Sequence, residues 1–238
     1  MSKRAVDWAA LRTPRPGVLG APGLRERKKR LMRQQLSDTA TEMFIERGFD
    51  AVRVVEVAEA CGVSEKTVYN YFPNKESLLL DRWETTMASL QTGLADPDVT
   101  AVKAAQQILA DELHGLTSWL AAQDDPAAAG ALFQRFGTMI SATPALRAHQ
   151  RDMTDQLIAV AAEILAGRAG MNSDDPEPQI AATAVIGLWQ IQFQSLRKHL
   201  DGTRVPAHLH QVVTDDVERA ARLIDTGLQS LEQGDDPK

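Results

Sequence analysis

The sequence predicts an all-α fold of about nine helices. Apolar residues recur at the spacing of one helix face along nearly the whole chain after position 23. The breaks between these runs are short and rich in Gly, Pro or Asp, as in "QDDPAA", "SATP" and "DGTRVP". No alternating strand pattern of useful length and no internal repeat interrupts this order. Together these observations predict helices throughout.

Residues 1–23 differ from the rest of the chain. Pro and Gly are frequent there, large apolar groups are few, and basic residues exceed acidic ones. Such a segment cannot bury enough apolar surface to fold by itself, so we expect a mostly disordered basic arm.

The first helix is predicted to begin at Leu24 and to end before Gly48, because glycine favours the position after a helix. Its apolar face is formed by Met32, Leu36, Ala40, Met43 and Phe44. Two short helices follow. The first of them carries one apolar stripe, formed by Val54, Val57, Ala58 and Cys61. Ser64 can cap the second, which is stopped by Pro73.

A longer helix is predicted after Asn74, which can cap it. Its apolar face is formed by Leu79, Trp83, Met87, Leu90 and Leu94. Three further helical stripes follow Pro97. They are formed by Val102, Leu109, Leu113, Leu116 and Leu120, by Leu132, Phe136, Met139 and Ile140, and by Leu146, Met153, Leu157 and Ile164.

The last two predicted helices are the most apolar. In "QIAATAVIGLWQIQFQSL" apolar residues cover more than one face, so this helix must be buried on two sides. The final helix carries one unbroken apolar stripe from Leu209 to Leu231. We interpret the pair as a subunit interface, and the alternative is a helix in the core of one subunit.

The two short helices and their glycine-containing turn match a helix-turn-helix. On the second helix, Val68 and Phe72 would pack inward. The opposite face carries a cation, a hydroxyl and an amide, from Lys66, Thr67 and Asn70. Such groups suit base edges, thymine methyls and phosphates in a major groove. The alternative is an ordinary helical corner with a polar outer face.

The stretch "FIERGFDAVRVVEVAEACGVSEKTVYNYFPNKESLL" closely resembles the amino-terminal DNA-binding domain of TetR-family transcriptional regulators. The match covers about Leu31 to Leu79 and includes "GF", "AEACGVS", "TVYNYF" and "KESLL". The resemblance implies a three-helix DNA-binding domain over residues 24–80 and a ligand-binding and dimerisation domain over residues 81–238. It also implies a homodimer, joined through the last two helices, that binds a palindromic operator in double-stranded DNA.

The resemblance also implies which residues meet DNA. The contacts carried over to the recognition helix are Ser64, Lys66, Thr67, Tyr69 and Asn70. Tyr71 and Lys75 match positions that typically hold phosphates, and the N–H groups at the start of the fourth helix can help. For Tyr69 the alternative is packing against the first helix.

Arg53 departs from the family pattern. The family often has Thr or Ser just before the second helix, where it caps the helix and touches a phosphate. Arginine has no side-chain oxygen for capping, so we expect a small loss of stability there. Its guanidinium could still reach a phosphate directly.

Charge is distributed unevenly. The chain has a net charge of −6, yet residues 1–80 hold 14 Lys and Arg against 10 Asp and Glu, whereas residues 81–238 hold 12 against 22. The overall acidity therefore does not exclude nucleic acid as a partner. The steepest basic cluster is "LRERKKRLMR", from Leu24 to Arg33. It is interpreted either as a solvated helix face or as a source of phosphate or minor-groove contacts, together with the arm.

For the second domain, the resemblance implies a small-molecule effector that shifts the dimer between two spacings of its recognition helices. Aromatic and methionine side chains favour an apolar or aromatic effector. The candidates are Trp119, Phe133, Phe136, Met139, Met153, Trp189 and Phe193. Each could instead be plain core, and Trp189 and Phe193 could belong to the dimer interface.

Other classes of function find little support in the sequence. A single cysteine excludes an intrachain disulfide, and no apolar run reaches the ~18 residues of a membrane span. We therefore expect a cytoplasmic protein. No nucleophile–base pair, phosphate loop or metal-ligand spacing occurs, so no enzyme activity, metal or cofactor is expected. A repressor is the leading interpretation, with an activator or an architectural DNA-binding protein as alternatives.

Overall fold

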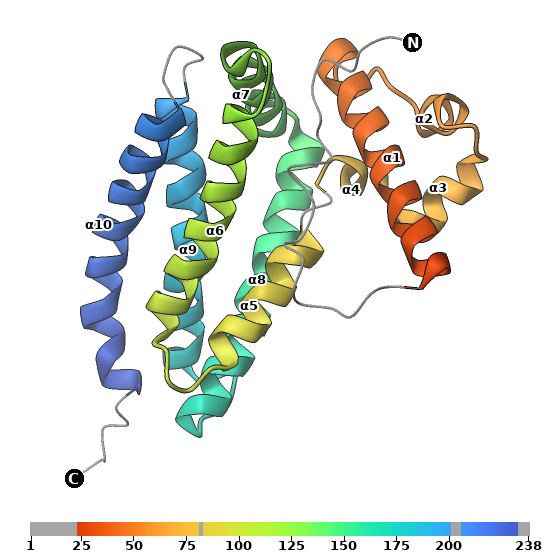
Figure 1. The fold of residues 1–238 in the computed structure, drawn as a ribbon. Coiled ribbons are helices and arrows are strands. Elements are labelled where there is room, and N and C mark those ends of the chain that lie inside the picture. The colour runs from red at the N-terminus through yellow and green to blue at the C-terminus, as the bar shows by residue number, and fades with distance from the viewer. Residues whose placement is uncertain (1–22, 81–82, 201–205, 233–238) are drawn as a thin grey trace. The chain divides into compact units, whose positions relative to one another are not determined.

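The computed structural model describes residues 23–80, 83–200 and 206–232 (Figure 1). Within these ranges the chain forms ten α-helices and no strand, which confirms the all-α fold class. Residues 1–22, which make up all but the last position of the predicted basic arm, lie outside the described residues. Among the described helices, none combines the length and the apolar character needed to cross a bilayer.

The described chain has one helix more than the nine predicted. The ten are α1 (Leu24–Arg47), α2 (Val54–Ala60), α3 (Glu65–Tyr71), α4 (Lys75–Leu79), α5 (Trp83–Ala95), α6 (Ala101–Ala121), α7 (Pro126–Ala142), α8 (Pro144–Ala169), α9 (Pro176–His199) and α10 (Pro206–Glu232). The long helix expected after Asn74 is instead α4 and α5, because Leu80 leaves helical geometry with φ −100° and ψ 45°. Leu79 and Leu90 keep helical spacing across this break, so the apolar pattern did not reveal it.

The chain divides into two compact units. The first holds the described residues up to Trp83 together with Arg135–Gln150. The second holds Glu84–Gln134 and the described residues from Arg151 onward. The segment Arg135–Gln150, which falls within the predicted range 81–238, thus belongs to the same unit as α1 to α4. It contains the end of α7 and the beginning of α8.

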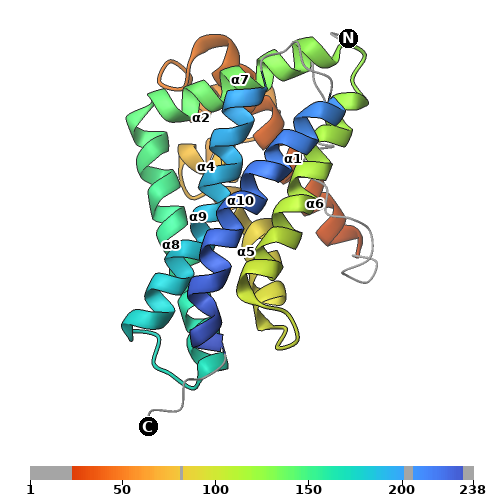
Figure 2. The ribbon, with the colours of Figure 1, turned by 90° about the vertical axis from the view of Figure 1, so that its left-hand side faces the viewer.

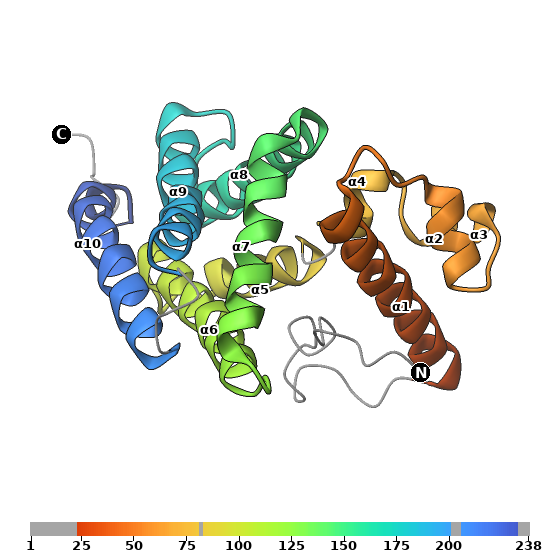
Figure 3. The same ribbon diagram turned by 90° about the horizontal axis from the view of Figure 1, so that it is seen from above.

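The core of the first unit is built by α1 and by the short helices beside it. Figure 3 shows α2, α3 and α4 on one side of α1. The buried side chains of this core are Leu36, Ala40, Phe44, Phe49, Val52, Val54, Val57, Ala58, Val68, Phe72, Leu78, Leu79, Ile140 and Leu146. Each large apolar side chain buried in this way contributes about 1.5–3 kcal/mol. The core can therefore hold helices that are too short to be stable alone.

Side-chain hydrogen bonds to backbone carbonyls tie distant parts of the first unit together. Ser37 Oγ donates to the Leu78 carbonyl at 2.7 Å and links α1 to α4. The Arg135 guanidinium donates to the Ile45 carbonyl at 3.0 Å, near the end of α1. These bonds satisfy carbonyls that lie near helix ends, where intrahelical partners are missing.

The second unit is organised around α6, α9 and α10, which lie side by side (Figure 2). Their buried side chains include Leu109, Leu113, Leu116 and Leu120 of α6, Val185 and Leu188 of α9, and Leu209, Val213 and Val217 of α10. Near the end of α8, the Arg168 guanidinium donates to the carbonyls of Leu94 and Val99, at 3.1 and 3.0 Å. This side chain closes the turn between α5 and α6.

A polar cluster joins α9 to α10. Ser195 Oγ donates to the Asp216 carboxylate at 2.7 Å, His199 Nε2 lies 3.5 Å from the same oxygen, and Arg219 pairs with the other oxygen. The Ser195 hydrogen bond, with help from Arg219, lowers the pKa of Asp216. The carboxylate is thereby kept charged beside the Ser195 hydroxyl and the Arg219 guanidinium.

The apolar surface of α9 and α10 is not fully covered within one chain. Ile180 of α9 is 65% exposed and Leu223 of α10 is 83% exposed. The sequence predicts that α9 is buried on two sides, and Ile180 shows that one side stays open in the single chain.

Candidate DNA-binding surface

The turn before α3 is set by its glycine. Gly62 has φ +69°, a region that favours glycine. The N–H groups of Gly62 and Val63 donate to the carbonyls of Glu59 and Ala58, at 3.1 and 3.0 Å. This is the Schellman pattern, which ends α2 and turns the chain toward α3.

Ser64 caps α3, as predicted. Its Oγ accepts a hydrogen bond from the Thr67 backbone N–H at 3.1 Å and lies 2.8 Å from the Thr67 hydroxyl. The two hydroxyls therefore form one polar group at the start of the helix. Ser64 is exposed and Thr67 is half-buried, so this group lies at the surface.

The two faces of α3 are divided largely as the sequence predicts, except that Thr67, expected on the outer face, is half-buried. Val68 and Phe72 are completely buried in the core of the first unit, whereas Lys66, Tyr69 and Asn70 are exposed. The buried pair fixes the helix through packing, and its outward side chains take no part in the core. The outward face of α3 thus presents a cation, an amide and a phenol to solvent.

The two tyrosines of α3 have different environments. Tyr69 is 47% exposed, which disfavours the alternative that it packs against α1. Tyr71 is half-buried and packs against the core of the unit. Its carbonyl accepts a hydrogen bond from Arg33 Nη1 at 3.0 Å, and the Arg33 guanidinium lies 4.7 Å from the centre of the Phe72 ring. Arg33 therefore holds α3 against α1.

The start of α4 is fixed by a reciprocal cap. Asn74 Oδ1 accepts from the Ser77 N–H at 2.8 Å, and Ser77 Oγ donates to the Asn74 carbonyl at 2.7 Å. This confirms the capping role predicted for Asn74. One of the N–H groups at this helix end is therefore already bonded within the chain.

Lys75 lies against the protein. Its Nζ donates to the Phe49 carbonyl at 2.6 Å and lies 4.3 Å from the centre of the Phe49 ring. Burial lowers the pKa of Lys75, although Asp50 opposes the effect. An ammonium has three donors, so a phosphate contact would have to use the two that do not face Phe49.

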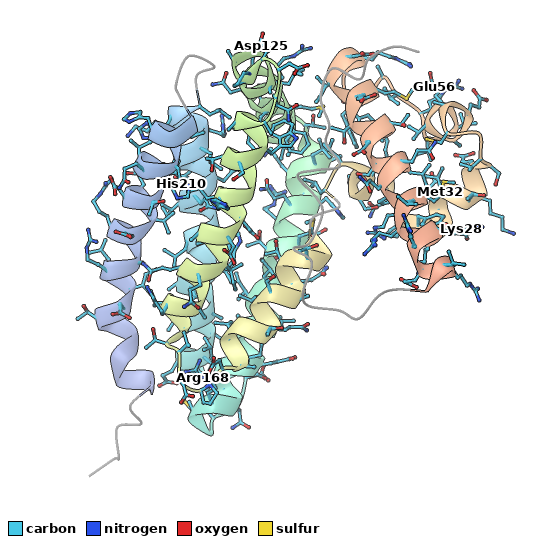
Figure 4. The ribbon with its side chains drawn as sticks, in the orientation of Figure 1. Lys28, Met32, Glu56, Asp125, Arg168 and His210 are labelled. Atoms are coloured by element: carbon cyan, nitrogen blue, oxygen red, sulfur yellow. The ribbon has the colours of Figure 1, made fainter. Side chains whose placement is uncertain are left out.

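Arg53 stands at the start of α2 and makes no side-chain cap. The missing cap is partly replaced by Glu56, whose carboxylate accepts from the Arg53 backbone N–H at 2.8 Å (Figure 4). Arg47 Nη2 binds the other carboxylate oxygen at 2.8 Å. The backbone bond, followed by Arg47, lowers the pKa of Glu56 to about 2.

The Arg53 side chain itself is directed toward solvent. It is 77% exposed and lies 3.4 Å from Glu56 Oε2. Sequence reasoning did not identify Glu56, although a Glu three residues after a helix start is the signal for this bond. The eight predicted DNA-binding residues thus comprise exposed groups (Arg53, Ser64, Lys66, Tyr69, Asn70) and half-buried ones (Thr67, Tyr71, Lys75).

The seven predicted effector-binding residues are divided between the two units. Phe136 and Met139 are in the first unit and pack against its core. The other five, Trp119, Phe133, Met153, Trp189 and Phe193, are in the second unit. Of these, Trp119 is buried and the remaining four are half-buried.

Trp189 has a specific polar partner that the sequence did not reveal. Its Nε1 donates to Glu112 Oε2 at 3.2 Å, and Thr86 Oγ1 donates to Glu112 Oε1 at 2.8 Å. One carboxylate of α6 therefore links α5 and α9. Phe193 instead has the Arg197 guanidinium 6.0 Å from its ring centre.

The described surface has hollows in both units. One, of about 1050 Å³, lies in the first unit between α1 and α3, and the other, of about 400 Å³, lies in the second unit between α6 and α10. Neither is lined by any of the seven predicted effector-binding residues. In the described part of the chain, no group of three or more His, Cys, Asp or Glu could hold a metal ion.

Two sequence models of known families match the chain. The model of bacterial regulatory proteins of the tetR family matches residues 36–81. The model described as the MftR C-terminal domain matches residues 121–229. The first range contains α2, α3 and α4 with the core around them, and the second covers most of the second unit.

Curated relatives are similar over both parts. HTH-type transcriptional regulator TcmR of Streptomyces glaucescens is 29% identical over 65% of this chain and 67% of its own length. The putative mycofactocin biosynthesis transcriptional regulator MftR of Mycobacterium tuberculosis is 27% identical over 68% of this chain and 78% of its own length. A solved structure, a TetR transcriptional regulator from Rhodococcus sp. RHA1, has 21% identity and a TM-score of 0.44, covering 86% of this chain and 98% of that one.

Proposed function

The chain belongs to the tetR family of bacterial regulatory proteins and is a DNA-binding transcriptional regulator, and from this premise we propose that it is a ligand-responsive repressor. In this proposal it acts in the cytoplasm, binds a palindromic operator as a homodimer and is released by a small apolar or aromatic molecule. It does not act as an enzyme.

The division of α3 into a buried and an exposed face supports operator binding most directly. Val68 and Phe72 carry the packing, so the outward residues need not stabilise the fold. Lys66 and Asn70 then reach base edges or phosphates in the major groove, and Tyr69 lies at the edge of the same face. Ser64 and Thr67 add hydroxyls at the start of the helix, while Arg53, Tyr71 and Lys75 bind the flanking phosphates.

A homodimer through α9 and α10 is supported by their exposed apolar side chains. Ile180 and Leu223 lie on the two helices that the apolar pattern already marks as an interface. If a second copy covers them, a two-fold axis relates the two chains, and Ile180 and Leu223 of both copies are buried in the interface. A two-fold dimer presents one α3 to each half of a palindrome.

For the effector, the aromatic and methionine residues of the second unit remain the candidates. Trp119, Phe133, Met153, Trp189 and Phe193 offer apolar surface, and Glu112 offers a carboxylate beside Trp189. A ligand controls DNA binding only if it binds the two dimer geometries with different affinity. The proposed effector therefore binds the released geometry more tightly than the DNA-bound one.

Footprinting on DNA from the chain's own upstream region, at physiological salt, tests the operator. We expect a short protected palindrome, with binding abolished when its half-sites are scrambled. Equal protection of unrelated DNA would favour the architectural alternative and overturn the proposal. An intact palindrome with increased transcription from a linked promoter would instead favour an activator.

A further inference from the structure

The carboxyl end of α3 is not capped by the residues that follow Phe72. The last carbonyls of a helix have no partner within the helix, so they need donors from outside it. Pro73 has no N–H group, and the Asn74 N–H donates to Ser77 Oγ at 3.4 Å. The carbonyl of Tyr71, the last residue of α3, therefore takes its donor from another part of the chain.

Arg33 of α1 supplies this donor. Its Nη1 donates to the Tyr71 carbonyl at 3.0 Å, and its guanidinium lies 4.7 Å from the centre of the Phe72 ring, which is completely buried. A cation is favoured at the carboxyl end of a helix, and α3 has no basic residue in its own last turn. One side chain of α1 thus provides both the hydrogen bond and the charge that the end of α3 lacks.

This role separates Arg33 from the other cations of its cluster. Arg33 is half-buried. The exposed members of the cluster are Arg25, Arg27, Lys28, Lys29 and Arg30. The guanidinium of Arg33 is directed at the recognition helix of the same chain, whereas the other five side chains are open to solvent.

The Arg33 bond adds something that packing does not supply. Val68 and Phe72 hold α3 against the core by apolar burial, which has no preferred direction. A hydrogen bond weakens steeply when its angle or its length departs from the optimum. In Figure 4, Met32, next to Arg33 in the chain, lies at the end of α1 that is beside α3, and a hollow of about 1050 Å³ lies between the two helices there. The bond therefore fixes the carboxyl end of α3 where side chains do not fill the space between α1 and α3.

We propose that Arg33 is a positioning residue for sequence recognition, which touches no DNA and aligns the outward face of α3 with the base edges. Asn70, on that face, precedes Tyr71 in the last turn of the helix, so its place depends directly on the Arg33 bond. Base edges are read by hydrogen bonds of fixed geometry, whereas phosphate contacts carry no sequence information. Arg33 therefore governs discrimination between DNA sequences. The proposal rests on the proposed function, because it requires α3 to lie in the major groove.

The test compares two variants of the full chain that remove the same charge from α1. Arg33→Met removes the donor and the cation but keeps a long apolar side chain, and Arg30→Met removes an exposed cation one turn earlier. Affinity is measured by fluorescence anisotropy over a range of KCl concentrations. The probes are a labelled duplex from the chain's upstream region and a scrambled duplex of equal length. The quantity compared is the ratio of the two affinities, because partial unfolding lowers both affinities by the same factor and leaves their ratio unchanged.

Arg33→Met is expected to lower this ratio about tenfold, which is the discrimination that about one good base contact supplies. Its plot of log affinity against log salt on the scrambled duplex should keep the slope of the unmodified chain, because no phosphate contact is lost. Arg33→Lys retains a cation and a donor without the planar group, so it should restore part of the ratio. Arg30→Met should keep the ratio of the unmodified chain.

Three outcomes would overturn the inference. An unchanged ratio in Arg33→Met, together with a lower free energy of unfolding in urea, would mean that Arg33 only stabilises the fold. A salt slope shallower by about 0.9 would mean that Arg33 binds a phosphate. An equal fall of the ratio in Arg30→Met would mean that the ratio reports the charge of α1. Failure of the proposed function looks different, because the unmodified chain itself then binds the upstream and scrambled duplexes equally.

Discussion

The short helices α2, α3 and α4 of the first unit and the long helix α9 of the second are stabilised by different means. Helices α2, α3 and α4 have seven, seven and five residues, and each has a side-chain hydrogen bond at its start, from Glu56, Ser64 and Asn74. Helix α9 has 24 residues and no side-chain cap, and it is held by buried apolar residues along its length. The surfaces differ in the same way. Helix α3 of the first unit exposes polar and cationic side chains, whereas α9 and α10 of the second expose Ile180 and Leu223.

This difference determines how much of the function of each unit can be inferred from its sequence. In the first unit the outward residues of α3 are not needed for packing, so their chemistry indicates function. In the second unit the same apolar pattern fits the core, the proposed subunit interface and the proposed effector site alike. For that reason one sequence is enough to propose a surface for DNA, but it does not separate an effector site from the core.

The largest effect is expected from Phe72→Ala, which removes a completely buried ring from the core that holds α3. Loss of a buried Phe costs about 3–5 kcal/mol of unfolding free energy. Urea unfolding measures this decrease. Tyr69→Ala, on the exposed side of the same helix, is the control and should change stability little while weakening DNA binding. Similar destabilisation by both changes would contradict the division of α3 into two faces.

The next effect is expected at the proposed interface of the second unit. Leu223→Ala should shift the dimer toward monomer, since burying each Leu contributes about 1.5–3 kcal/mol and a two-fold dimer buries it twice. Sedimentation equilibrium measures the dissociation constant. The exposed Leu24 of α1 provides the matched control. If Leu24→Ala weakens the dimer as much as Leu223→Ala, then the interface is not on α10.

Asn74→Ala tests the caps of the first unit. The change removes the hydrogen bond to the Ser77 N–H and should reduce the free energy of unfolding by about 0.5–2 kcal/mol. Asn74→Asp retains the acceptor oxygen and should recover most of this decrease. Urea unfolding of both variants measures the difference. A stability unchanged in Asn74→Ala would show that α4 depends on packing alone, as α9 does.

Arg53→Ala separates DNA affinity from folding. The guanidinium is mostly exposed, so urea unfolding should show little change. Binding should weaken alike for the upstream and scrambled duplexes, and the salt slope should fall by about 0.9 if Arg53 neutralises one phosphate. A salt slope equal to that of the unmodified chain would remove Arg53 from the DNA-binding surface.

The smallest effect concerns Glu56 and pH. Its pKa is lowered from the ordinary value of 4.5 to about 2 in the folded chain. A lowered pKa stabilises the fold above pH 4.5, and this contribution is lost as pH falls from 4.5 toward 2. Glu56→Gln should therefore reduce the pH dependence of urea unfolding across that range. An identical pH dependence in the variant would show that Glu56 has the same pKa in the folded chain as in the unfolded one.

Local signals in the sequence predicted much of the first unit. Ser64 and Asn74 are the caps that their residue types favour, and Gly48 and Gly62 follow the ends of α1 and α2. Val68 and Phe72 were placed inward by helical spacing alone. These features depend on a few neighbouring residues, so one sequence is enough to reveal them.

Other features depend on contacts between residues far apart in the chain. Glu112 gave no signal for its bonds to Thr86 and Trp189, because no spacing rule relates α5, α6 and α9. Phe136 and Met139 fit an effector site by residue type, yet they pack against the core of the first unit. Helix α7 has one continuous apolar pattern, so the sequence contained no mark that its last part joins a different unit.

The positive φ of Gly62 means that the turn distinguishes L-amino acids from D-amino acids. Apart from Gly62 itself and the residues on either side of it in the chain, no heavy atom lies within 4 Å of the position that a Cβ would take there, so the surrounding structure leaves room for L-alanine. The cost of L-alanine is therefore one of backbone chirality, about 1–2 kcal/mol for a left-handed conformation. A mirror-image D-alanine prefers the positive φ that L-alanine avoids. The preference for glycine at this turn is thus a matter of backbone stereochemistry and not of space for a side chain.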